Sequence, residues 1–109
     1  MAFSIEEMTK EMGLAALNVF KDKYPATKTF AEAEFRKLGE TIIAIETAKL
    51  RGEIKEDEAK LLFHMQREAM RAVLLTVEGV GIILAEQAIN EALAVVKDSI
   101  NAAIGWRLV

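Results

Sequence analysis

Three polar side chains in the second half of the chain have types suited to ligand binding or proton transfer. His64, Arg71 and Glu78 follow one another at intervals of seven residues. Seven residues are close to two helical turns, so one continuous helix would place the three on one face. Ala85 and Val96 share that face, and a carboxylate buried there must pair or take up a proton. We therefore take His64, Arg71 and Glu78 as a candidate ligand-binding site. The alternatives are a purely structural ion-pair network and simple exposure near a helix end.

The only histidine does not have the spacing of a metal site. Helical di-iron bundles place a glutamate three residues before the histidine, whereas Leu61 stands there in this chain and Glu68 follows His64. The chain has no cysteine, so disulfides and thiolate ligands are excluded. We expect no metal and no cofactor.

No pattern in the chain is typical of a catalytic centre. A nucleophile with an adjacent base is missing, and Gly79-Val80-Gly81 lacks the third glycine and the preceding strand of a dinucleotide-binding turn. We expect a protein that is not an enzyme.

A stripe of small residues lies along one side of the last helical stretch. Small side chains let two helices approach closely. The apolar fraction of 52% exceeds the usual range of about 45–50%, which favours a contact between subunits over one within the chain. The predicted oligomer seam consists of Gly81, Ala85, Ala88, Ala92, Ser99 and Ala103.

Helix-start and helix-stop signals divide the first half of the chain. Ser4 and Glu7 form a capping box that predicts a helix over about 4–23. Pro25 marks a loop, and a second capping box at Thr29 predicts a helix over about 29–51 that Gly52 ends.

In the second half of the chain, residues 79–81 are compatible with either a helix break or a continuous helix. Helical periodicity runs over about 55–106, interrupted only by glycines at 79–81. Helix–helix turns usually contain polar turn-formers, so the sequence favours one long helix, kinked at most. The predicted fold is an all-α bundle of two shorter helices and one long C-terminal helix in a single domain, 1–109, with an up-down four-helix bundle as the alternative.

Charge and hydropathy narrow the classes of partner. The net charge of −3, from 14 basic and 17 acidic residues, argues against a nucleic-acid-binding module, which usually shows a clustered basic face. The charge-free runs around Glu78 are too short for the roughly 20 residues of a transmembrane helix. No signal-peptide pattern opens the chain, so we expect a cytoplasmic protein.

These features together predict a non-enzymatic structural or interaction protein. In the leading hypothesis it is a homo-oligomer, most simply a dimer, joined through its apolar C-terminal helix. One alternative is a bundle that binds a small ligand of unknown identity near Arg71 and Glu78. Another is a helical protein associated with a membrane surface.

Overall fold

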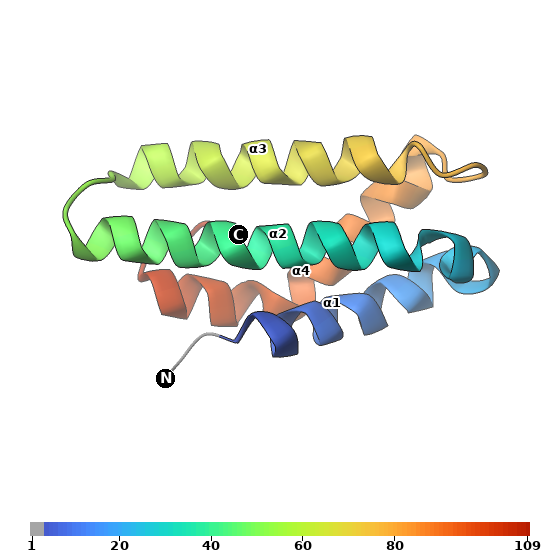
Figure 1. The fold of residues 1–109 in the computed structure, drawn as a ribbon, viewed down its shortest axis with the longest axis horizontal. Helices are drawn as coiled ribbons and strands as arrows, with labels where there is room; N and C mark the ends of the chain where they lie inside the picture. The colour runs from blue at the N-terminus through green and yellow to red at the C-terminus, as the bar shows by residue number, and fades with distance from the viewer. Residues whose placement is uncertain (1–3) are drawn as a thin grey trace.

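The computed structural model describes residues 4–109, which form an all-α bundle. Its helices are α1 (Ile5–Phe20), α2 (Tyr24–Leu50), α3 (Glu56–Leu74) and α4 (Ile82–Ile104), with a short 3-10 turn, η1 (Lys21–Lys23), between the first two. Successive helices reverse direction along the long axis of the molecule (Figure 1). The predicted all-α class is confirmed, in its up-down four-helix form.

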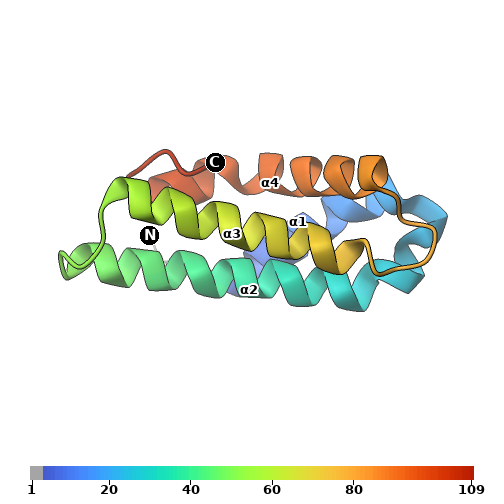
Figure 2. The same ribbon diagram turned by 90° about the horizontal axis from the view of Figure 1, so that it is seen from above.

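The helices do not share the core equally. α2 lies beside both α1 and α3, and α4 crosses obliquely behind α2 to pack most extensively against α1 (Figure 1). Contact between α3 and α4 is slight. Viewed from above, α3 forms an outer layer of the bundle, with no helix on its outward side (Figure 2). It is therefore held in place mainly by α2.

The start of α1 agrees with its predicted cap. The Ser4 side chain accepts a hydrogen bond from the backbone N–H of Glu7 at 3.2 Å. This bond satisfies one of the N–H groups that the first helical turn leaves without a partner.

Replacing Ser4 by alanine is expected to destabilise the protein by about 1 kcal/mol, because the Glu7 N–H loses its acceptor. Urea denaturation of the wild type and Ser4→Ala measures the difference. Ser4→Asp is the matched control, since aspartate restores the acceptor and should recover most of the lost stability. Equal stability of all three proteins would contradict a role for this cap.

The predicted boundary between the first two helices is wrong. α2 begins at Tyr24 rather than Thr29, and Thr29 lies inside the helix. Pro25 occupies the first turn, where its missing N–H would have no helical partner in any case. The chain reverses just before, where Lys21 has the left-handed φ of +53°. Proline therefore marks the first turn of α2, and the expected loop over 24–28 does not exist.

The predicted long helix over 55–106 is also wrong. α3 ends at Leu74 and α4 begins at Ile82. In the connection between them, Gly79 has φ +87°, a conformation that glycine adopts readily, and Val80 is buried in the core. A continuous helix would carry the apolar side of residues 82–104 away from α1. The reversal buries it instead.

The predicted breaks at Gly52 and near Lys55 are confirmed. α2 ends at Leu50, and Gly52 follows with φ +69°. α3 then starts after Lys55, whose backbone N–H donates to the Glu58 carboxylate at 2.9 Å. This tight connection sets α2 and α3 side by side (Figure 1).

The C-terminal residues fold back along α4. Gly105 ends the helix with φ +82°, and the Asn101 side-chain oxygen then accepts from the backbone N–H of Leu108 at 2.9 Å and of Val109 at 3.1 Å. This arrangement fixes the segment after α4 against the bundle.

Candidate functional site

The predicted line of His64, Arg71 and Glu78 is not formed. Because α3 ends at Leu74, Glu78 lies in the connection to α4, where it is exposed. His64 is exposed on α3, and Arg71 is half-buried near the end of that helix. No ion pair among residues 4–109 joins Arg71 to Glu78. The predicted burial of Glu78 is therefore wrong, and with it the geometric argument for a site there.

Arg71 instead belongs to a polar cluster that links α3 to α4. Its guanidinium contacts Glu68 on the same helix at 2.7 Å and Glu86 on α4 at 3.6 Å. Arg67 contacts Glu86 at 3.1 Å and donates to the Asn90 side chain at 2.6 Å. These side chains are partly exposed, so each pair contributes modestly, about 0–1 kcal/mol. The cluster supplies polar contacts between two helices that pack against each other only slightly.

The small-residue stripe is largely an internal feature of the chain. Ala85, Ala88 and Ala92 are fully buried within one chain. α4 packs most extensively against α1, whose buried residues include Ala15 and Ala16. The prediction that these alanines join two subunits is therefore wrong, because a second chain cannot reach them. Gly81 lies just before α4, Ser99 is exposed and Ala103 is half-buried.

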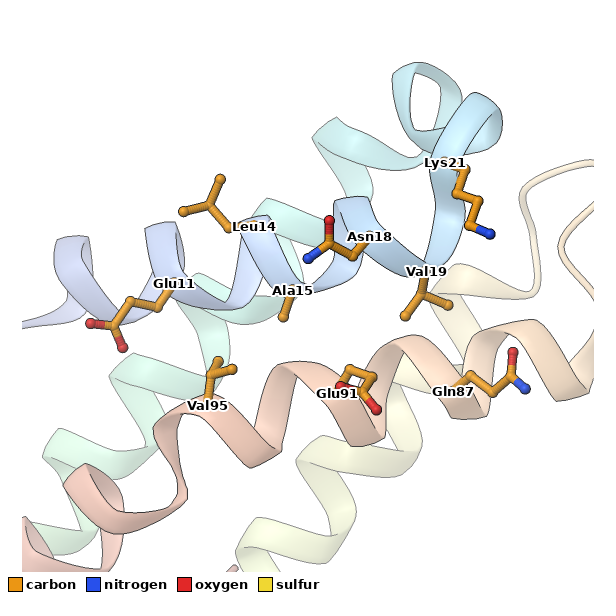
Figure 3. Close-up of a pocket in the computed structure, with 9 residues that line it drawn as sticks. All are labelled: Glu11, Leu14, Ala15, Asn18, Val19, Lys21, Gln87, Glu91 and Val95. Carbon is orange, nitrogen blue, oxygen red and sulfur yellow. The ribbon is translucent and has the colours of Figure 1, made fainter.

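An open groove of about 840 Å³ follows the boundary between α1 and α4 (Figure 3). Ala15 and Val19 on α1 point towards α4, whereas Leu14 points away from it (Figure 3). Polar side chains from both helices surround this apolar strip. They are Glu11, Asn18, Lys21, Gln87 and Glu91. The groove holds carboxylates and an amine but no hydroxyl, thiol or imidazole, so it does not combine a nucleophile with a base.

A second groove, of about 400 Å³, lies between α1 and α2 and contains the phenol of Tyr24. Burial and the negative charge of Glu32 raise the pKa of Tyr24 above its usual value. The phenol therefore stays protonated at neutral pH. In the same groove the hydrogen bond and positive charge of Arg36 lower the pKa of Glu6. Neither group is poised for proton transfer near pH 7.

A third groove, of about 460 Å³, lies between α3, α4 and the C-terminal segment, and we call it the basic groove. His64, the one predicted site residue in it, lines it beside Lys60 and Arg67 of α3 and Lys97 of α4. Asn90 also lines it, and the remaining lining residues are apolar. They are Phe63, Leu93, Ala94, Leu108 and Val109. No acidic side chain lines it among the residues that the structure describes. Sequence reasoning missed this cluster because its cations come from two helices.

The outward side of α3 is apolar, and we call it the α3 outer face. Helical steps of about 100° place five residues on this side. Leu61, Leu62 and Met65 are exposed to 59%, 42% and 57%, and Ala69 and Ala72 are also exposed. The opposite side of the helix buries Phe63 and Met70 in the core. α3 is therefore apolar on two sides, only one of which the bundle covers.

Two further classes of site lack support in the described part of the chain. Residues 4–109 bring together no group of three or more His, Asp or Glu side chains that could hold a metal ion. Within the same range, none of the helices combines the length and apolar character needed to cross a bilayer.

Comparison with known proteins adds no identification. No protein-family model, curated protein or solved structure matches this chain. The surfaces of the bundle therefore carry the functional proposal.

Proposed function

We propose that this chain is a non-enzymatic interaction protein that forms a homodimer through the α3 outer face. The observation that carries the proposal is the exposure of three large apolar side chains, Leu61, Leu62 and Met65, on one side of one helix. Single exposed apolar residues are normal on protein surfaces. A contiguous exposed apolar patch is a common mark of an interaction surface.

The face is continuous along the helix. From Leu61 to Ala72, each residue on the outward side is apolar, and the neighbouring Glu68 is paired with Arg71. A 19-residue helix is roughly 28 Å long. The face therefore offers a partner helix a contact over about two-thirds of that length.

The order of residue sizes on this face favours a second copy of the same chain as the partner. The large residues, Leu61, Leu62 and Met65, occupy its N-terminal half, and the small ones, Ala69 and Ala72, its C-terminal half. A two-fold axis that pairs two α3 helices antiparallel sets the large half of each against the small half of the other. Large side chains that face small ones can interdigitate, as they do in packed helix pairs.

The expected oligomer is thus retained, but its interface moves from the C-terminal helix to α3. The apolar side of α4 is already buried against the rest of its own chain through Ala85, Ile89 and Val96. Within residues 4–109, nothing covers the outward side of α3 in this way.

Measurement of solution mass tests the proposal. At about 100 µM, a concentration that reveals even micromolar dimers, light scattering should give twice the chain mass of 12.1 kDa. The double variant Leu61→Glu/Met65→Glu should be a folded monomer at this concentration, because dimerisation would bury unpaired carboxylates. The dissociation constant of its dimer should rise at least about a hundredfold. Circular dichroism checks that the helices remain.

Ile83→Glu is the control, because it replaces an apolar residue that is even more exposed, at 76%, at the start of α4. It should leave the dimer intact. A wild-type monomer at this concentration would overturn the proposal, as would a dimer that survives Leu61→Glu/Met65→Glu. Liposome binding by a monomeric wild type, lost in that variant, would assign the face to membrane association instead.

A further inference from the structure

The basic groove concentrates positive charge in a chain whose net charge is −3. Lys60, His64, Arg67 and Lys97 line it, and no acidic side chain does so within residues 4–109. Acidic residues outnumber basic ones along the chain, yet the charged side chains that line this groove are basic ones. Clefts lined by one sign of charge attract ligands of the opposite sign.

The cations of the groove differ in how free they are to meet a ligand. Arg67 is held by Glu86 and Asn90. Lys60 contacts the exposed Glu56 on its own helix at 3.0 Å, a surface pair that is weak and easily exchanged. Lys97 takes part in no ion pair within the described part of the chain. Lys60 comes from α3 and Lys97 from α4, and both line the same groove.

The floor of the groove is apolar and already in place. Phe63 and Leu93 are nearly buried, at 5% and 6% exposure, and belong to the core of the bundle. Leu108 closes one side, where Asn101 holds the C-terminal segment by its backbone. A ligand would therefore meet a preformed apolar surface, which reduces the entropy lost on binding.

The shape and chemistry of the groove select the class of ligand. A volume of about 460 Å³ lies within the roughly 300–1,000 Å³ of small-molecule sites. The lysine ammonium groups act as point charges without the fixed bidentate geometry of arginine. The apolar floor adds affinity for a hydrocarbon or aromatic body that a simple inorganic anion lacks.

We infer that the basic groove binds a small organic anion, a carboxylate with a short apolar chain, with its charged group between Lys60 and Lys97 and its chain against Phe63, Leu93 and Leu108. The groove lies on the side of α3 that faces α4, away from the α3 outer face. This inference therefore stands independently of dimerisation.

Titration calorimetry with octanoate, below its micellar concentration, tests the site. Octanoate should bind in saturable fashion, whereas acetate, which lacks the chain, and octyltrimethylammonium, which has the opposite charge, should bind at least about tenfold more weakly, a difference of 1.4 kcal/mol. Amide shifts in nuclear magnetic resonance spectra should change most over residues 60–67, 90–97 and 108–109. Absence of saturable octanoate binding, or shifts confined to other residues, would overturn the inference.

Charge-matched variants separate this groove from the general surface. Lys60→Gln/Lys97→Gln should weaken octanoate binding about tenfold. Lys10→Gln/Lys28→Gln removes the same charge from exposed positions on α1 and α2 and should change binding less than about twofold. Both pairs lie on the surface, so the fold should survive, and melting curves verify that it does. Equal loss in the two variants, or no loss in the first, would contradict the assignment.

Discussion

Replacing Phe35 by alanine is expected to lower the free energy of unfolding by about 3–5 kcal/mol. Phe35 lies near the middle of α2, the helix that contacts each of the other three, and its side chain is fully buried. Its removal leaves a cavity in the core that the surrounding side chains fill only in part. Because small domains are stable by about 5–15 kcal/mol, this one substitution should remove a large part of the total stability.

Phe30→Ala is the matched control, since it makes the same chemical change on the same helix at a side chain that is 48% exposed. It should cost no more than about 1–1.5 kcal/mol, because roughly half of the usual burial energy is at stake. Urea denaturation followed by circular dichroism compares the two variants with the wild type. Equal losses at Phe35 and Phe30 would contradict the position of α2 at the centre of the core.

Apolar periodicity in the sequence predicts correctly which side of each early helix is buried. In the second helix, the apolar residues Phe35, Leu38, Ile42 and Ile45 recur at spacings of three and four, which puts them on one side, and all four are buried. In the first helix, Met8 and Met12 are buried too. This succeeds because helical geometry alone decides which residues share a side, whatever that side packs against.

The connection at 75–81 depends on packing between distant parts of the chain, which local signals do not contain. Gly79 and Gly81 are compatible with either a turn or a bent helix. What selects the turn is the burial of Ala85, Ala88 and Ala92 after the chain folds back, with α1 as the main neighbour of α4. Two glycines destabilise a continuous helix by about 2 kcal/mol. The burial of several apolar side chains contributes more than that, so burial is the larger of the two effects that favour the turn.

The polar residues show the same limit. Helical steps of about 100° put Glu86 and Asn90 on the side of α4 away from its buried alanines, and both accept a hydrogen bond from Arg67 of α3. His64 likewise meets Lys97 in one groove only because α3 and α4 lie together. A periodic pattern identifies a polar side of a helix but does not show which helix lies over it. The periodicity of a single helix therefore cannot reveal a candidate site that two helices build together.

Ala88→Leu and Ala92→Leu are each expected to destabilise the folded chain by about 1–3 kcal/mol, because overpacking forces helices apart. Both alanines are fully buried on α4, and α4 packs most extensively against α1. Leucine is almost as good a helix former as alanine, so the loss would come from packing. Ala102→Leu is the control, because Ala102 is exposed on the same helix, and it should have little effect.

The manner of the loss distinguishes a contact within the chain from one between subunits. If the alanines pack inside one chain, Ala92→Leu lowers the melting temperature by a similar amount whether or not Leu61→Glu/Met65→Glu is also present, because distant sites act additively. If instead they joined two subunits, Ala92→Leu would yield a folded monomer, and its effect would vanish in a chain that is already monomeric. Thermal melts of the wild type, each variant and the combination supply the comparison. A folded Ala92→Leu monomer with unchanged melting would show that α4 meets a second chain after all.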